Sequence, residues 1–270
     1  MKRVLVFVAA FLAAGVSRAQ VPPPLINPVG STTPDPTALR GDSSVDEILD
    51  ALQARGKSLK EFVADVTLTD TDIVMGDSSK RTGKVWYQLR DDDNARMHIF
   101  FDKKLVDDKP PRDDRKEYLL EDGWAVDRDY LHKSETKYQI ARAGEKMNLF
   151  QLGKGAFPLP IGQDKSDVHG MFDVTRIPAA KDDPLNTVHL QLKPKSKTDF
   201  EKKFSAIDVW VDFVTKMPVR ISTEDKNHAN QQQTDLEDLK VNPKPGLKDE
   251  DFTVPPIDDA GWNRHEEPLP

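Results

Sequence analysis

The clearest pattern in the chain is an alternation of apolar and polar side chains along residues 206–224. Ile207, Val209 and Val211 occupy every second position before Pro218, and the alternation resumes after this proline. A period of two on both sides of a short bend predicts an antiparallel hairpin with one apolar face and one solvent-facing side.

The same period marks a series of short segments elsewhere in the chain. Predicted strands cover residues 62–69, 83–89, 96–101, 118–120, 124–129, 136–141, 172–177, 187–192 and 231–240. The sequence Glu121-Asp122-Gly123 lies between two of them and is a strong turn signal, because Asp and Gly tolerate the backbone of a tight hairpin turn. Many short strands at hairpin spacing predict a mainly β chain, built on one strongly curved antiparallel sheet or barrel.

Two segments depart from the period of two. Residues 45–53 follow a serine that can cap a helix, and they have apolar side chains at helical spacing, at Val45, Ile48, Leu49 and Leu52. We expect this helix to end at or near Gly56. Residues 144–170 interrupt the strands with an apolar helix-plus-loop stretch, which predicts a segment that packs over another part of the protein.

The two ends of the chain have a different composition from the middle. Residues 1–19 combine Lys2 and Arg3 with an apolar run and small residues, which predicts a secretory signal peptide cleaved before Gln20. Residues 20–42 are rich in proline and predict a flexible leader. We therefore expect a folded domain over residues 43–256, closed by Phe252 in DFTVPP, and an exposed tail over 257–270.

Composition and motifs exclude several kinds of chemistry. The chain has no cysteine, so disulfides, thiolate metal sites and cysteine catalysis are excluded. A net charge of -7 disfavours nucleic acid and anionic membrane as direct partners. The six histidines lack metal-ligand spacing, and no nucleophile or phosphate-binding motif is present. The sequence therefore predicts no catalytic residue, metal or cofactor, and the acidic run at 91–93 is interpreted as a solvated turn.

The order of the segments resembles the LolA-like family of periplasmic carriers of outer-membrane lipoproteins. The segments concerned are the helix VDEILDALQARGKSLKEF, the strand GKVWYQL, the turn LLEDGWAVD, the apolar insertion, LQLKPKSK, the hairpin IDVWVDFVTKMPVRISTED and the closing DFTVPP. Together they cover residues 45–256, most of the chain beyond the predicted signal peptide.

The resemblance implies a fold, a location and a function. The fold would be an incomplete antiparallel β-barrel with an apolar concave face, an N-terminal helix and a mid-chain helical lid. The protein would be a soluble periplasmic carrier, not an enzyme, and would bind acyl chains of lipoproteins or other lipids. Its partners would be this cargo, an inner-membrane release complex and an outer-membrane acceptor.

The resemblance also implies a site. The cavity wall would be the single sheet face bearing Val66, Leu68, Val85, Tyr87, Ile99, Phe101, Val209 and Ile221. The lid would consist of Ile48, Leu52, Met147, Leu149, Phe150, Phe157, Leu159 and Ile161. In the family, a basic residue followed by proline helps to hold the lid. Arg90 is its counterpart here, but Asp91 follows it in place of proline.

Two other functions are compatible with the residues. A sensor or interaction module could use the same scaffold without transporting anything, because a fold does not fix its function. A secreted hydrolase could use a pair of facing carboxylates. A filled core and a stable protein partner would favour the first alternative, whereas loss of turnover on replacing two carboxylates would favour the second.

Overall fold

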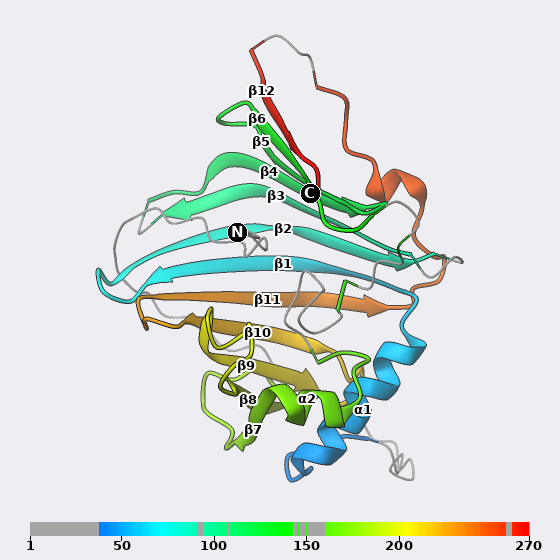
Figure 1. Cartoon of the computed structure of the whole chain (residues 1–270), viewed down its shortest axis with the longest axis vertical. Coiled ribbons are helices and arrows are strands. Elements are labelled where there is room, and N and C mark those ends of the chain that lie inside the picture. Colours follow the sequence, from blue (N-terminus) through cyan, green and yellow to red (C-terminus); the bar gives the residue numbers. More distant parts are fainter. Residues whose placement is uncertain are drawn as a thin grey trace, which may run out of the picture.

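Twelve strands form one continuous, curved sheet with two α-helices beside one end of it (Figure 1). The computed structural model describes residues 38–90, 94–106, 109–142, 145, 149–150, 160–257 and 261–269. The predicted signal peptide and most of the predicted leader lie outside the described residues. No helix in the described ranges is long and apolar enough to cross a membrane.

The elements follow one another with short connections in most places. They are α1 (Val45–Ser58), β1 (Glu61–Asp72), β2 (Asp77–Leu89), β3 (Ala95–Val106), β4 (Arg112–Glu121), β5 (Trp124–Asp129), β6 (Ser134–Gln139), α2 (Lys165–Met171), β7 (Phe172–Ile177), β8 (Thr187–Pro194), β9 (Phe204–Asp212), β10 (Pro218–Asp225), β11 (Asn230–Val241), the 3-10 helix η1 (Asp249–Phe252) and β12 (Asn263–Glu267).

The strand order is β12-β6-β5-β4-β3-β2-β1-β11-β10-β9-β8-β7. The chain runs back and forth from β1 to β6, crosses to the other edge, and returns from β7 to β11, which pairs with β1. Neighbouring strands are antiparallel except for β12 and β6, which are parallel. The sheet stays open between its edge strands β12 and β7. This arrangement confirms the predicted fold class, a mainly β chain with a curved, incompletely closed antiparallel sheet and an N-terminal helix.

The hairpin predicted from residues 206–224 is β9 and β10. Ile207, Val209 and Val211 are completely buried, and Val209 lies directly opposite Ile221. The connecting turn is held by the Asp212 carboxylate, which accepts hydrogen bonds from the backbone of the following residues. The alternation therefore identifies the buried face correctly.

Helix α1 is longer than the sequence predicts. Ser44 caps it reciprocally with Glu47, and the helix continues through Gly56 to Ser58. A Cβ at Gly56 would lie 2.2 Å from the Cα of Gly162, so this glycine permits a close approach of two backbones and does not end the helix. The packing partner that requires a glycine there is distant in sequence, so the local pattern alone favours a helix end at Gly56.

Two further elements have no clear sequence signal. Helix α2 lies within the predicted interruption and has only seven residues. Strand β12 lies within the predicted exposed tail, and its five side chains are indeed exposed. Its backbone nevertheless pairs with β6, from Asn263 opposite Ser134 to Glu267 opposite Tyr138. A polar strand with no buried side chain has no apolar alternation to reveal it.

Residues 249–255, which include η1, lie on the outer face of the sheet, opposite the face that packs against the helices. Asp251 and Pro255 present their backbone oxygens to His98 and Arg128, at 2.8 and 2.5 Å. Phe252 is buried beneath the Arg96 guanidinium, 4.1 Å from its ring centre. The C-terminal segment is thereby fixed across strands β3 and β5.

Truncating Phe252 tests this attachment. Phe252→Ala removes a buried ring and should lower the free energy of unfolding by about 3–5 kcal/mol, measured by urea denaturation. Phe252→Leu should recover a large part of the loss. A decrease below about 1 kcal/mol would place Phe252 outside the core.

Candidate functional site

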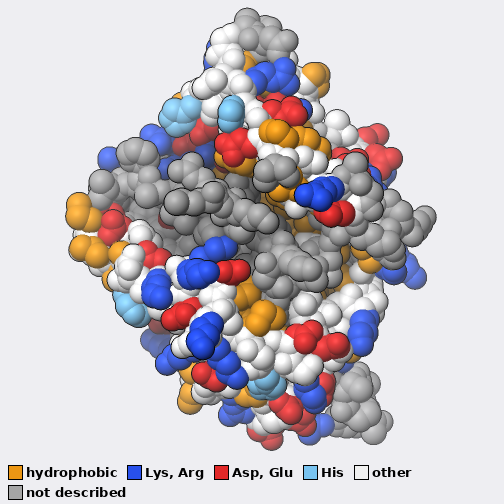
Figure 2. Space-filling view, in the orientation of Figure 1, with side chains coloured by type: hydrophobic (Ala, Val, Ile, Leu, Met, Phe, Trp, Pro, Cys, Tyr) orange, Lys and Arg blue, Asp and Glu red, His pale blue; other side chains and the backbone are white. Residues whose placement is uncertain are grey.

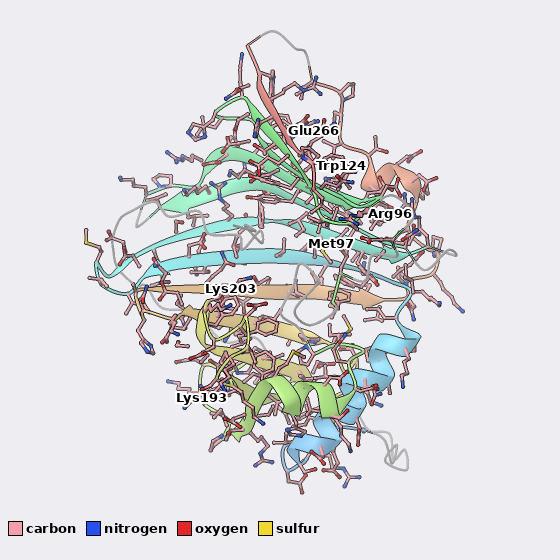
Figure 3. The ribbon with its side chains drawn as sticks, viewed as in Figure 1. Arg96, Met97, Trp124, Lys193, Lys203 and Glu266 are labelled. Atoms are coloured by element: carbon pink, nitrogen blue, oxygen red, sulfur yellow. The ribbon has the colours of Figure 1, made fainter. Side chains whose placement is uncertain are left out.

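The eight predicted cavity residues lie on one face of the sheet, here called the inner face. The strand register shows this, because directly paired residues share a face. Val85 lies opposite Ile99 across β2 and β3, and Ile221 lies opposite Val209 across β10 and β9. The same pairing extends through β1 and β11 to all eight positions: Val66, Leu68, Val85, Tyr87, Ile99, Phe101, Val209 and Ile221. Consecutive residues of a strand point to opposite faces, so Met97 shares the inner face and Arg96, labelled with it in Figure 3, lies on the outer face.

The inner face is only partly covered. Five of the eight residues are buried, namely Val66, Val85, Tyr87, Phe101 and Val209. The other three, Leu68, Ile99 and Ile221, are half-buried. Leu236 on β11 joins them and is also half-buried, opposite Val66. The inner face therefore keeps several aliphatic side chains that the rest of the described chain does not fully cover.

The described part of the predicted lid lies against this face. Ile48 and Leu52 of α1 are completely buried, and Leu149, Phe150 and Ile161 are buried as well. The Phe150 ring centre is 5.0 Å from that of Tyr87, which in turn stacks on Phe62 at 5.3 Å. Met147, Phe157 and Leu159 lie outside the described residues.

Backbone contacts hold the lid segment to α1. The Gly162 N–H donates to the Leu52 carbonyl at 3.1 Å, next to the close approach of Gly56 and Gly162. The Gln163 side-chain amide donates to the carbonyls of both Phe150 and Ile161 at 3.2 Å. These hydrogen bonds add to the buried side chains of Leu149, Phe150 and Ile161 in fixing the described part of the lid.

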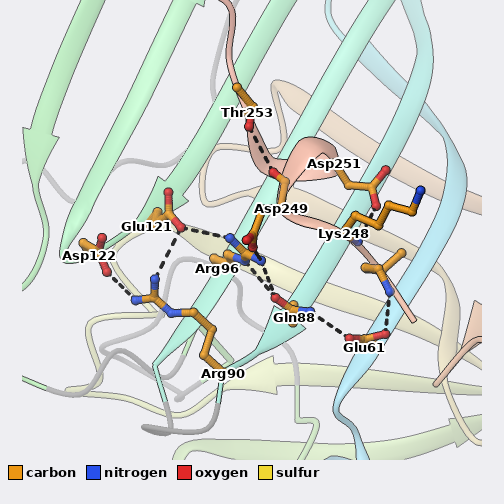
Figure 4. A network of polar contacts seen from close by, with 11 residues as sticks. Glu61, Gln88, Arg90, Arg96, Glu121, Asp122, Lys248, Asp249, Asp251 and Thr253 are labelled. Atoms are coloured by element: carbon orange, nitrogen blue, oxygen red, sulfur yellow. Dashed lines mark hydrogen bonds and ion pairs between the residues drawn. The ribbon is translucent and has the colours of Figure 1, made fainter. Parts of the chain in front are cut away.

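Arg90 takes part in a polar network at one end of the sheet (Figure 4). Its guanidinium donates to Glu121 at 3.4 Å and to Asp122, both at the turn between β4 and β5. Arg96 extends the network from Glu121 to Gln88. Arg90 is thus anchored to the rim of the sheet, and its predicted role as a lid latch stays a prediction.

Charged side chains occupy another part of the inner face, which the sequence did not single out. Arg81 lies opposite Leu68 and forms a buried ion pair with Asp114 at 2.8 Å. Lys116 lies opposite Phe101 and pairs with Asp129 at 3.2 Å. The inner face is therefore amphipathic, with ion pairs beside the apolar side chains.

Burial shifts the ionisation of groups on this face. It raises the pKa of the Asp70 and Asp127 carboxyls above their ordinary value of 3.8, although the Gln232 amide partly stabilises the Asp70 carboxylate. It also lowers the pKa of the Lys104 amine, and it raises that of the Tyr87 hydroxyl to about 12. Each shift disfavours the charged form, as expected where side chains lose contact with water.

Several acidic residues that could serve a hydrolase have structural partners. Asp183 accepts a hydrogen bond from the Trp210 indole at 2.7 Å, and Asp113 pairs with Lys103 at 2.5 Å. His189 contacts Asp208 at 2.7 Å, on the outer face of the sheet. Within the described ranges, no group of three or more His, Cys, Asp or Glu residues is placed to hold a metal ion.

Comparisons with known proteins give similarity in structure alone. No protein-family model and no curated protein sequence matches the chain. An uncharacterized conserved protein from Thermus thermophilus is similar with 12% identity and a TM-score of 0.45, over 82% of this chain and 99% of that chain. MucB, in the structure of the Pseudomonas aeruginosa MucA/MucB complex, has 13% identity and a TM-score of 0.44, over 78% of this chain and 60% of that chain.

A LolA superfamily protein from Nitrosomonas europaea is also similar, with 11% identity and a TM-score of 0.32, over 76% of this chain and 97% of that chain. LolA-like proteins are thus among the structures similar to this one, as the sequence resemblance predicts. With such identities and with TM-scores below 0.5, these similarities leave the function open.

The pKa shift at Asp127 gives a test of the charged part of the inner face. Asp127→Asn should raise the free energy of unfolding at pH 7, because the folded wild type must hold a carboxylate that burial disfavours. The gain should shrink as the pH falls toward 3.8, since the folded wild type then takes up the proton before the unfolded chain does.

Asp113→Asn is the matched control. The Lys103 ammonium holds the pKa of the exposed Asp113 carboxyl below its usual value, so this substitution should lower stability slightly at pH 7. Urea denaturation as a function of pH measures both variants. Equal stability of Asp127→Asn and wild type at pH 7 would contradict the prediction.

Proposed function

We propose that this protein binds acyl chains of lipids or lipoproteins on the inner face of its sheet and carries them across the bacterial periplasm. The observation behind the proposal is the partly covered apolar face, where Leu68, Ile99, Ile221 and Leu236 remain half-buried. An acyl chain laid along these side chains would complete their burial. The lid segment would close over it, with Phe150 against Tyr87 and Gly162 hydrogen-bonded to Leu52 of α1.

The binding free energy would be favourable even if only part of an acyl chain were buried. Each methylene group removed from water contributes about 0.8 kcal/mol, so part of one acyl chain would give useful affinity. A carrier must also release its cargo, which favours a face without a charged anchor at its apolar centre and a lid that opens readily. The ion pairs of Arg81 and Lys116 beside the apolar side chains would contact the polar part of an amphiphilic cargo.

Location and partners belong to the same proposal. The signal-like order of residues 1–19 supports export, after which the carrier would meet a donor at the inner membrane and an acceptor at the outer membrane. Such a protein would bind and release its cargo without chemical change. No step of this function requires a catalytic residue or a cofactor.

A second candidate is an interaction module, and one observation favours it. Strand β12 pairs with β6 although its five side chains are exposed, so the β6 edge accepts an added strand mainly through its backbone, with the Arg264–Glu135 ion pair beside it. A partner protein could use the same edge by taking the place of β12. Stable capture of a protein together with an inner face that takes no lipid would favour this candidate.

Displacement of a fluorescent fatty acid tests the carrier function. Wild-type protein should bind the probe saturably, and natural lipids should displace it. Gentle extraction of protein purified from its own periplasm should also yield lipid by native mass spectrometry. A folded protein with no saturable binding and no extracted lipid would overturn the proposal.

Substitution of Ile99 locates the binding face. Ile99→Asp puts a charge on a half-buried position of the inner face and should weaken probe binding about tenfold or more, with the fold retained. The matched control is Val63→Asp, at a half-buried aliphatic on the outer face of β1, which should bind normally. Val209 is completely buried, so Val209→Asp should unfold the domain. Equal binding by both folded variants would place the ligand elsewhere.

A further inference from the structure

The turn between β1 and β2 exposes three consecutive large apolar side chains. Ile73, Val74 and Met75, here called the β1–β2 tip, are 43, 77 and 61% exposed. Figure 2 shows apolar side chains at the left margin of the molecule, where Figure 1 places this turn. The other large hydrophobic residues that are exposed in the described ranges occur singly, as is ordinary for protein surfaces.

The backbone of this turn is satisfied from within the protein. The Asp72 carboxylate accepts hydrogen bonds from the N–H groups of Val74 and Met75, each at 2.9 Å. The Gly76 N–H donates to the Asp72 carbonyl at 2.9 Å, and the Ile73 N–H donates to the Ala229 carbonyl at 2.8 Å. All four N–H groups of residues 73–76 therefore have protein acceptors. Entry into a region with less water would leave none of these donors unpaired, which removes one part of the cost of placing a turn there.

The shape and area of the tip indicate the kind of partner. Three side chains on one tight, protruding turn bury far less than the roughly 1,600 Å² of a standard protein interface. Shallow insertion into the boundary between head groups and acyl chains, in contrast, needs only a few apolar side chains on a rigid support. β1 and β2 supply that support through twelve directly opposed residue pairs, ending at Asp72 and Asp77.

The charges around the tip indicate the kind of lipid surface. No Lys or Arg lies within residues 73–76, acidic residues flank the turn at Asp72 and Asp77, and the chain has a net charge of -7. Attraction to anionic head groups is therefore not the driving force. We propose that the β1–β2 tip docks the protein on a zwitterionic lipid bilayer by inserting Ile73, Val74 and Met75 between the head groups. The docking is weak and reversible, and it does not depend on the function proposed for the inner face.

The absence of cysteine in the chain allows a site-specific test on the protein as purified from the periplasm. Val74→Cys and Val214→Cys each receive an environment-sensitive fluorophore. Val214 is a matched control, since it is 80% exposed and lies in the β9–β10 turn, at the other end of β10 from the tip. With phosphatidylcholine vesicles, the label at position 74 should shift to the blue and be quenched by nitroxide-labelled lipid. The label at position 214 should do neither.

Charge substitutions give the second measurement. Val74→Asp should weaken vesicle co-sedimentation about tenfold or more, whereas Val214→Asp should leave it unchanged. Both variants should keep the wild-type melting temperature, because both positions are exposed. Both should also bind the fluorescent fatty acid as wild type does, which separates failure of docking from failure of the proposed carrier function.

Four results would overturn the proposal. One is no response of the label at position 74, and another is an equal response at both positions. A third is binding that requires anionic phosphatidylglycerol and disappears at high salt, which would indicate electrostatic attachment. The fourth is a shift at position 74 that depends on protein concentration without lipid, which would show that a second copy of the chain covers the tip.

Discussion

The pairing of β1 with β11 makes one sheet out of two. Strands β1 to β6 and β7 to β11 each form consecutive hairpins from neighbouring parts of the chain, whereas β1 and β11 lie near opposite ends of the domain sequence. Their register extends from Phe62 opposite Val241 to Asp72 opposite Asn230. The loop-closure entropy of this long-range contact opposes its formation, so burial along the whole inner face must offset it.

The candidate site depends on this β1–β11 pairing, here called the seam. Val66 and Leu68 of β1 lie beside Leu236 and Thr234 of β11, which makes the inner face continuous between the two halves. The halves differ in character. On the β7–β11 side, Ile207, Val209 and Val211 of β9 are completely buried, whereas the β1–β6 side also holds the ion pairs of Arg81 and Lys116. A ligand lying across the seam would meet apolar side chains on both halves and charged groups on one of them.

Alternation in the sequence was sufficient to predict which face of most strands is buried, because side-chain direction in a strand is a local property. It predicted Val85, Tyr87 and Val209 correctly for this reason. It could not predict that Arg81 of β2 would meet Asp114 of β4, since this contact depends on how β3 pairs with both of its neighbours.

Other features were not predicted because they also depend on contacts between distant parts of the chain. Leu236 was included in a predicted strand, but its alternation with its neighbours was imperfect. β11 pairs with β1 through an irregularity between Val63 and Asp65, which shifts the register at that point. Strand β12 has no apolar side to recognise, and Gly56 needs Gly162 beside it before its role is visible. The function of the inner face rests on its shape and on how far it is filled, which residue order alone does not determine.

The attachment of the C-terminal segment has a consequence for how this sequence can diverge. His98 and Arg128 contact the backbone oxygens of Asp251 and Pro255, and every amino acid supplies such an oxygen. Selection for these two contacts therefore acts on His98 in β3 and Arg128 in β5. The residues at positions 251 and 255 can change without loss of the contacts, because only their backbone oxygens take part. Homologous proteins could retain the same crossing segment while sharing almost no recognisable sequence within it, apart from an aromatic residue at the position of Phe252.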